Sequence, residues 1–325
     1  MGLGRVALGR LSAMRYGVVF PGQGSQAVGM GGALVEAFPQ ARDLFARAER
    51  VLGYDLLQIV REGPEEKLRE TRYSQPAIYV VNYALAAAAD LPVVASAGHS
   101  FGEFCSLTLA GALDFDEALG LVAERGLAMQ DAANVAPGAM AAILALDETV
   151  LREICAAVRD AGIGRVQLAN FNAPGQIVIS GDRDAVAVAG ERALEAGAKR
   201  VVPLNVSGAW HSELMAPARE RFAPFVERAS IRMPRFDVIS NVDGRPYASV
   251  AAIRENLVRS VTEEVLWHAA AVRLVEEGLD AIVEFGGSAV LAPLMKRVPG
   301  APPAKWIGDE RGVEKLRAEQ GAASR

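Results

Sequence analysis

A serine between two glycines is the feature of this sequence best suited to chemistry. Residues 98–102 read GHSFG and match the G-x-S-x-G pattern of a nucleophile elbow. An apolar run over 93–97 predicts a buried strand before the serine, and 104–111 predict a helix after it. Flanking glycines permit such a tight turn, which holds the Ser100 hydroxyl beside the free N–H groups of the helix start. The pattern therefore favours Ser100 as a nucleophile over an ordinary capping serine in a glycine-rich turn.

A serine nucleophile needs a base, and the chain has 3 histidines. His99 adjoins the serine, so its side chain should diverge from the serine side chain and line the pocket at most. His268 lies at helix-like spacing and is expected to be a surface or packing histidine. His211 follows the last predicted strand of a small domain, on a loop, where catalytic groups are usually mounted. An imidazole with a pKa of about 6.5 at that place can take the serine proton and return it to a leaving group.

The loop after the first predicted strand, residues 21–26 (PGQGSQ), is a candidate for one side of an oxyanion hole. Its glycines let a backbone N–H approach a substrate closely, and one such donor is worth roughly 3–4 kcal/mol at the barrier. The loop also fits the dinucleotide-binding pattern in its alanine variant, through Gly22, Gly24 and Ala27. That alternative requires a second strand ending in an acid about 20 residues on. Asp43 stands at that distance but within helical spacing, so we reject the nucleotide-binding hypothesis.

Arg125 is a charged residue on an apolar helix face. Acids within 114–117 predict the start of this helix. Three apolar residues share the face of Arg125 at spacings of three and four: Leu121, Val122 and Met129. An arginine there must find an anion. A bidentate pair with a substrate carboxylate would select acyl groups that end in a free acid, and a structural ion pair with a protein Asp or Glu is the alternative.

Two α/β units follow from the order of the predicted elements. Strands alternating with helices predict a mainly parallel sheet, here in a large α/β-hydrolase-like domain over 16–136 and 207–298. Between these parts, residues 137–206 follow the order βαββαβ, which is typical of a ferredoxin-like unit, so we expect a small inserted domain. Residues 299–325 are expected to form a partly disordered tail.

The first 15 residues are expected to be a leader or the product of a start codon placed too early. They contain three arginines and no acid, and the apolar run between arginines is too short for a secretory signal. Met14 directly precedes the run 15–20 that leads into the first strand, which favours Met14 as the true start.

The composition excludes several classes of function. Of 325 residues, 51% are apolar and 22% charged, which indicates a globular protein rather than a disordered one. A net charge of −5 argues against nucleic acid as the main partner. No clean apolar run reaches about 18 residues, so no membrane span is expected. Two cysteines fit a reducing cytoplasm, and no ligand cluster has the spacing of a metal site.

Five segments, in order, resemble the malonyl-CoA:acyl carrier protein transacylases and the related acyltransferases of polyketide synthases. The segments are FPGQGSQ (20–26), GHSFGEF (98–104), the helix of Arg125, NFNAPGQ (170–176) and Ser207 with His211. The resemblance covers roughly residues 16–297. Their joint occurrence is far more specific than the serine pattern alone.

The resemblance implies roles for single residues. It implies that Ser100 is acylated and that His211 is its base. Backbone N–H groups of Gln23 and Phe101 would form the oxyanion hole, and Arg125 would hold the malonyl carboxylate. The residues implied to line the cleft or to orient the histidine are Met129, Asn172 and, through its backbone carbonyl, Leu266.

Two positions depart from the family pattern. Phe101 follows the serine, whereas many members of the family that this sequence resembles have Leu, Ile or Val at this position. Trp210 precedes the histidine with more bulk than many malonyl enzymes show. A large aromatic beside His211 should narrow the pocket and disfavour an α-methyl branch, so we expect malonyl to be preferred over methylmalonyl.

The implied reaction is ping-pong transfer of a malonyl group from malonyl-CoA, through Ser100, to the phosphopantetheine thiol of an acyl carrier protein, for fatty acid synthesis. It requires no metal or redox cofactor, and we expect a cytoplasmic monomer. A freestanding acyltransferase of a polyketide synthase, which residues 75–82 resemble, stays open and uses the same chemistry. An editing hydrolase is disfavoured because the Arg125 carboxylate clamp is wasted on simple acyl groups. A non-catalytic carrier-docking module is disfavoured by the joint presence of Ser100, His211 and Arg125.

Overall fold

The large lobe is built on a five-stranded parallel sheet. The computed structural model describes residues 14–31 and 33–323. The strand order is β7-β2-β1-β8-β9. The strands are β1 (Tyr16–Phe20), β2 (Val93–Gly98), β7 (Asp237–Ile239), β8 (Ala281–Phe285) and β9 (Ala304–Ile307). Every pairing between them is parallel, so the strands all end at the same edge, where the loops after β1, β2 and β7 lie side by side. The predicted mainly parallel sheet is confirmed.

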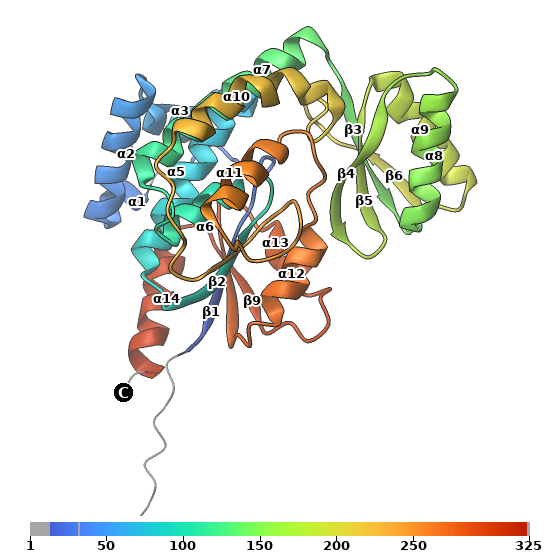
Figure 1. Ribbon diagram of the computed structural model, residues 1–325. Helices are drawn as coiled ribbons and strands as arrows, with labels where there is room; N and C mark the ends of the chain where they lie inside the picture. Colours follow the sequence, from blue (N-terminus) through green and yellow to red (C-terminus); the bar gives the residue numbers. More distant parts are fainter. Residues whose placement is uncertain (1–13, 32, 324–325) are drawn as a thin grey trace, which may run out of the picture.

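Helices cover both faces of this sheet (Figure 1). The face with the larger core carries α1 (Leu34–Ala37), α2 (Pro39–Leu52), α3 (Leu56–Glu62), α4 (Glu65–Arg69), α5 (Thr71–Ala89), α6 (Gly102–Leu109), α7 (Phe115–Val135), α10 (Ala216–Arg228), α11 (Val250–Arg259) and α14 (Glu310–Ala323). The opposite face carries α12 (Trp267–Val275) and α13 (Leu291–Met295). A short 3-10 helix, Glu213–Met215, precedes α10.

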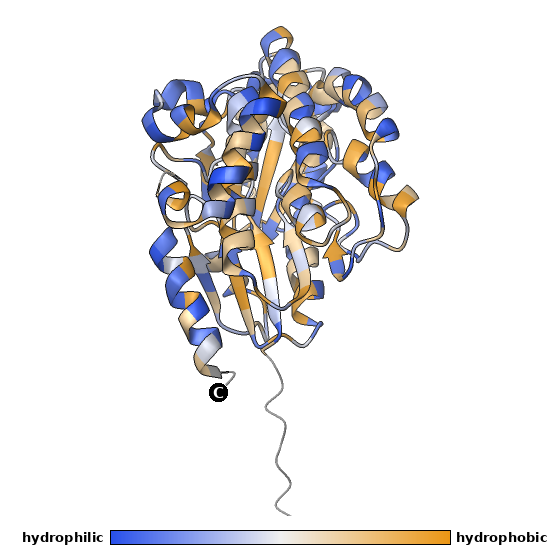
Figure 2. Cartoon of the chain, turned by 90° about the vertical axis from the view of Figure 1, so that its left-hand side faces the viewer, coloured by the Kyte–Doolittle hydropathy of each residue, from blue (hydrophilic) through white to orange (hydrophobic). Residues whose placement is uncertain are grey.

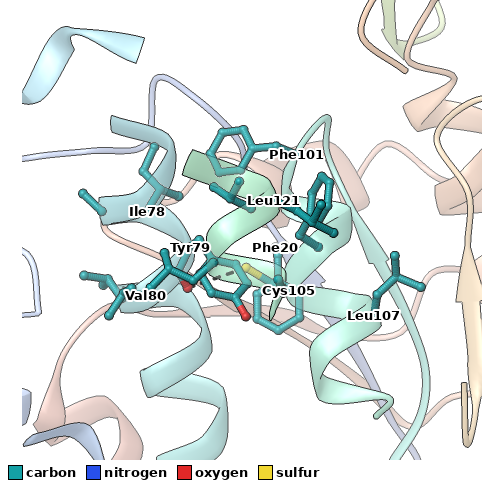
Figure 3. Close-up of a cluster of buried hydrophobic side chains, with 14 of the residues drawn as sticks. Phe20, Ile78, Tyr79, Val80, Phe101, Cys105, Leu107 and Leu121 are labelled. Atoms are coloured by element: carbon teal, nitrogen blue, oxygen red, sulfur yellow. Dashed lines mark hydrogen bonds between the residues drawn. The ribbon is translucent and has the colours of Figure 1, made fainter. Parts of the chain in front are cut away.

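Alternate residues of β1 enter the two cores. Val18 and Phe20 lie in the core with α5 and α6, whereas Val19 lies in the core with α12 and α13. Figure 3 shows Phe20 among side chains of both helices, including Tyr79 of α5 and Cys105 of α6. Because both faces are covered, the central strands are largely apolar, although β2 carries the buried Ser96 and β8 the buried Glu284, while the surrounding helices carry hydrophilic stripes (Figure 2).

The small lobe is a four-stranded antiparallel sheet in the order β4-β5-β3-β6. Its elements are β3 (Ala139–Leu144), α8 (Glu148–Asp160), β4 (Val166–Ala173), β5 (Gln176–Gly181), α9 (Arg183–Glu195) and β6 (Arg200–Pro203). This is the ferredoxin-like order, so the predicted fold of the insertion is confirmed. Both helices pack on one face of the sheet around Ile143, Leu168 and Ile179 (Figure 1). The other face turns Met140 and Val178 toward the large lobe.

The C-terminal segment differs from the prediction. Residues 299–325 were expected to be a partly disordered tail, but 304–307 form the edge strand β9 and 310–323 form α14. Val313 and Leu316 of α14 are fully buried in the larger core. The prediction is wrong because the apolar spacing of this segment is short and sparse, and only the tertiary contact with β8 and α5 stabilises it.

The expected leader falls almost wholly on residues 1–13, which lie outside the described residues. Within the described part of the chain, none of the helices combines the length and the apolarity that crossing a bilayer requires.

Candidate active site

Ser100 lies at the sharp turn between β2 and α6, with φ 54°. A Cβ added to Gly98 would lie 2.0 Å from the Gly102 carbonyl carbon, and one added to Gly102 would lie 2.4 Å from the Phe20 carbonyl oxygen. The two glycines are therefore required by close approach of backbone to backbone. The strand–serine–helix turn forms as the pattern predicts, at the carboxyl edge of the sheet.

His211 meets Ser100 from the segment that follows the small lobe. Its Nε2 lies 2.8 Å from Ser100 Oγ, and its Nδ1 lies 3.2 Å from the backbone oxygen of Glu263. A carbonyl oxygen can only accept, so Nδ1 carries the hydrogen and Nε2 is free to accept the serine proton. Leu266 was expected to supply this carbonyl, and that expectation is wrong. The Leu266 carbonyl instead accepts the N–H of Ala270 in the first turn of α12.

The surroundings of His211 keep its imidazole neutral. Burial, with smaller contributions from the Arg125 and His99 charges, lowers the pKa of His211 to about 3. The side chain is 3% exposed. The ring is therefore uncharged at neutral pH and can accept a proton from Ser100.

Arg125 of α7 reaches the same hydroxyl. It is 1% exposed, and its Nη2 lies 3.5 Å from Ser100 Oγ. Its Nη1 donates to Gln75 Oε1 at 3.0 Å, while its Nε is buried without a hydrogen-bond partner in the described part of the chain. Burial lowers its pKa to about 10, and Glu103 opposes that shift, so the guanidinium remains charged at neutral pH. No Asp or Glu of the described residues forms an ion pair with Arg125, which disfavours a purely structural ion pair.

The three side chains border a cleft of about 650 Å³ between the two lobes. Gln23 and Phe101, the two expected oxyanion donors, both line it. The N–H of Ser100 is occupied by Asn241 Oδ1 at 3.1 Å. Among the described residues, the N–H groups of Gln23 and Phe101 donate no hydrogen bond, so both are available to a substrate oxygen.

The remaining predicted cleft residues all lie in this cleft. Met129 is buried and accepts a long hydrogen bond from Gln75 Nε2 at 3.6 Å. Asn172 accepts from His99 Nε2 at 2.9 Å, so His99 lines the pocket and does not act on Ser100. Trp210 lies beside the base, and a Cβ added to Gly208 would lie 2.6 Å from the indole ring. Gly208 therefore makes room for the large ring.

The sequence predicted no role for four residues of the site: Gln75, Glu103, Gln167 and Asn241. Gln75 accepts a hydrogen bond from Arg125. Asn241 and Gln167 donate to the backbone carbonyls of Ser100 and His211, and Glu103 accepts from the Asn241 side chain. Gln75 and Asn241 had a usable signal, since Gln75 stands directly before the apolar run 76–81 and Asn241 closely follows the apolar residues 238–239. The contacts of Gln167 join two lobes, and nothing along the chain indicates them.

Among the described residues, no group of three or more His, Cys, Asp or Glu side chains could hold a metal ion.

Comparison with known proteins agrees with this geometry. The acyl transferase domain family matches residues 18–314. A malonyl CoA-acyl carrier protein transacylase of Bacillus subtilis is 40% identical over 299 residues, which span 91% of this chain and 94% of the relative.

Solved structures are equally similar. The malonyl CoA-acyl carrier protein transacylase of Coxiella burnetii has a TM-score of 0.89 at 35% identity and covers 95% of this chain and 98% of its own. A malonyl-transacylase in complex with a holo acyl-carrier protein of a type II polyketide synthase also has a TM-score of 0.89, at 38% identity, over 94% of this chain and 99% of its own. These matches cover nearly the whole chain, and the fold brings a serine, a histidine and an arginine into one cleft. The chain therefore belongs to the acyl transferase domain family and, within it, to the malonyl-CoA:acyl carrier protein transacylases.

Proposed function

We propose that the protein transfers a malonyl group from malonyl-CoA to the phosphopantetheine thiol of an acyl carrier protein, through a malonyl ester of Ser100. The observation that carries this proposal is the convergence on one hydroxyl. His211 Nε2 lies 2.8 Å from Ser100 Oγ and Arg125 Nη2 lies 3.5 Å from it. In a malonyl group only one CH₂ separates the thioester carbonyl from the carboxylate. A cation this close to the nucleophile therefore suits a short diacid.

In the first half-reaction, Ser100 Oγ attacks the thioester carbonyl as its proton passes to His211 Nε2. The developing oxyanion accepts hydrogen bonds from the N–H groups of Gln23 and Phe101. When the tetrahedral intermediate collapses, the C–S bond breaks, and the coenzyme A thiolate takes the proton from the imidazolium. Malonyl-Ser100 remains, with its carboxylate on Arg125.

The second half-reaction reverses these steps with a different thiol. His211 takes the proton of the phosphopantetheine thiol, the sulfur attacks the ester carbonyl, and the Ser100 oxygen leaves with the proton returned by His211. Ser100, His211 and the two thiols supply and accept every proton and electron pair in these steps, so the chemistry that we propose calls for no metal or redox cofactor.

The test is intact-mass analysis of the full chain mixed with malonyl-CoA. We expect one malonyl adduct, because the first half-reaction stores the acyl group on the enzyme. Holo acyl carrier protein should then discharge the adduct and itself gain the malonyl group, while the apo form, which lacks the thiol, should leave it in place. Absence of an adduct would contradict the proposal. Discharge by water as fast as by the holo carrier would favour the editing hydrolase instead.

Trp210 makes a prediction about the acyl group. Trp210 lines the cleft next to the base, and its bulk should exclude an α-methyl branch. We therefore expect kcat/KM for methylmalonyl-CoA to lie on the order of 10- to 100-fold below that for malonyl-CoA. Trp210→Ser should narrow this difference by opening the pocket. Equal kcat/KM values for the two thioesters in the unchanged enzyme would refute this role of Trp210.

Fatty acid synthesis is the pathway that we propose, because the curated relative over nearly the full chain carries the name of a malonyl CoA-acyl carrier protein transacylase. A freestanding transacylase that serves a polyketide synthase is the second candidate, favoured by the structural match to the enzyme bound to a type II carrier protein. Comparing kcat/KM for carrier proteins of the two classes distinguishes these pathways.

The cytoplasm is the compartment that we propose, since coenzyme A thioesters and carrier proteins meet there and both cysteines are buried free thiols.

A further inference from the structure

Both reacting residues have a left-handed backbone. Ser100 has φ 54° and His211 has φ 57°. Residues with a Cβ rarely adopt this conformation, and they keep it only where neighbouring groups hold the chain in place. The neighbours that hold these two residues therefore set the distance between the nucleophile and its base.

One side-chain amide brackets the backbone of Ser100. Asn241 Oδ1 accepts the Ser100 N–H at 3.1 Å, and Asn241 Nδ2 donates to the Ser100 carbonyl at 2.9 Å. Glu103 fixes which way the amide faces, because its carboxylate accepts from Asn241 Nδ2 and from the Asn241 N–H. The hydroxyl of Tyr247 donates to the other Glu103 oxygen. Asn241, Glu103 and Tyr247 are all buried, so this network is shielded from water.

A second amide brackets the backbone of His211 and comes from the small lobe. Gln167 of β4 donates from Nε2 to the His211 carbonyl at 3.3 Å and to the Thr262 carbonyl at 3.4 Å. Its Oε1 accepts the N–H of Glu213 at 3.0 Å. Two of these bonds hold the left-handed turn at His211, and the third joins Gln167 to the segment that contains Thr262.

Residues 262–266 connect the two brackets. This segment gives the Glu263 carbonyl to His211 Nδ1 and the Thr262 carbonyl to Gln167. At its end, the Leu266 N–H donates to the Asn241 carbonyl at 2.8 Å. Between these contacts it is bonded to the edge of β4: the Val265 N–H donates to the Ala169 carbonyl, and the Phe171 N–H donates to the Val265 carbonyl. The brackets and this segment form one connected frame that spans both lobes.

We propose that Asn241 and Gln167 are positioning residues for acyl transfer. Asn241 holds Ser100, Gln167 holds His211, and residues 262–266 tie the two together, so that the small lobe takes part in setting the nucleophile–base geometry. The proposal rests on the acyl transfer described above. Each amide acts through the backbone of the residue that it brackets. Removal of the imidazole should therefore abolish the effect of a Gln167 substitution on the rate, but not the effect of an Asn241 substitution.

The experiment is a double-mutant cycle on the full chain. Gln167→Met keeps the length of the side chain and removes its three hydrogen bonds. We expect it to lower kcat for malonyl transfer to holo carrier protein on the order of 10- to 100-fold, with KM for malonyl-CoA within about twofold of the original. In a His211→Ala background, where slow acylation is followed by intact mass, Gln167→Met should cause no further loss. An equal loss in both backgrounds would overturn the role of Gln167.

Arg152→Met is the matched control. Arg152 of α8 pairs with Glu264 at 2.7 Å across the same boundary between the lobes, and it makes no contact with His211. The kcat of the Arg152→Met variant should stay within about twofold of the original, since exposed ion pairs contribute little to stability. If Arg152→Met lowers kcat as much as Gln167→Met, docking of the lobes accounts for the effect and the proposal fails.

Asn241→Ala provides the second arm. It should lower kcat to a similar extent. In the His211→Ala background it should still lower the rate of acylation, because it misplaces Ser100 itself and does not act through the imidazole. An unchanged kcat would contradict the role of Asn241. Thermal unfolding shows whether the Asn241→Ala variant folds. If it does not fold, the double-mutant cycle of Gln167 and His211 tests the proposal on its own. An unchanged enzyme that forms no malonyl adduct refutes the proposed function itself, an outcome distinct from every outcome of the cycle.

Discussion

Ser100→Ala is expected to abolish malonyl transfer. The substitution removes the atom that attacks the thioester, and the remaining cleft can only bind the substrate. A drop in kcat on the order of 10⁴-fold or more is expected for loss of a serine nucleophile. The measurement is malonyl transfer to holo carrier protein, together with intact mass after mixing with malonyl-CoA. Neither transfer nor an adduct should be detected.

The fold should survive this substitution, because alanine fits the space of serine and the close contacts at the turn involve the flanking glycines. Ser230→Ala is the control for acylation elsewhere, since Ser230 is an exposed serine beyond the end of α10. It should give the same adduct as the unchanged protein. A malonyl adduct on Ser100→Ala, at the original rate, would place the nucleophile at another residue and exclude the mechanism described here.

Arg125→Ala is expected to remove the preference for an acyl group that ends in a carboxylate. Leaving a charged partner unpaired in a buried site costs about 2–5 kcal/mol, which corresponds to a fall in kcat/KM for malonyl-CoA of roughly 30- to 5,000-fold. Acetyl-CoA has no carboxylate, so its kcat/KM should change by less than about tenfold. The ratio of the two kcat/KM values is the quantity to measure.

Arg125→Lys separates charge from geometry. Lysine keeps the positive charge but cannot form the planar pair with a carboxylate or keep the bond to Gln75 in the same position. It should recover part of the malonyl activity and remain well below the unchanged enzyme. If Arg125→Ala lowers the kcat/KM of malonyl-CoA and acetyl-CoA by the same factor, Arg125 supports the fold of the cleft and does not select the substrate.

The sequence alone determined a large part of this picture. The elbow around Ser100 was predictable because short-range constraints act there: a buried strand, two glycines and a helix start lie within a dozen positions. The βαββαβ order of the small lobe was predictable for the same reason, since each element carries its own periodicity and turn residues. His211 followed by elimination, because so few histidines were available.

The tertiary structure decided what depends on segments far apart in the chain. The carbonyl that orients His211 belongs to Glu263 and not to Leu266, because α12 begins at Trp267 and its first turn uses the Leu266 carbonyl. The tail was expected to be partly disordered, yet its strand β9 pairs with β8 and completes the sheet. Local composition gave no sign of this pairing, because a strand is stabilised by the neighbour it pairs with. Asn241 and Gln167 act on residues 141 and 44 positions away. Local sequence encodes which elements form, whereas the direction of a hydrogen bond between two loops depends on how the completed lobes pack, and only the folded chain specifies that packing.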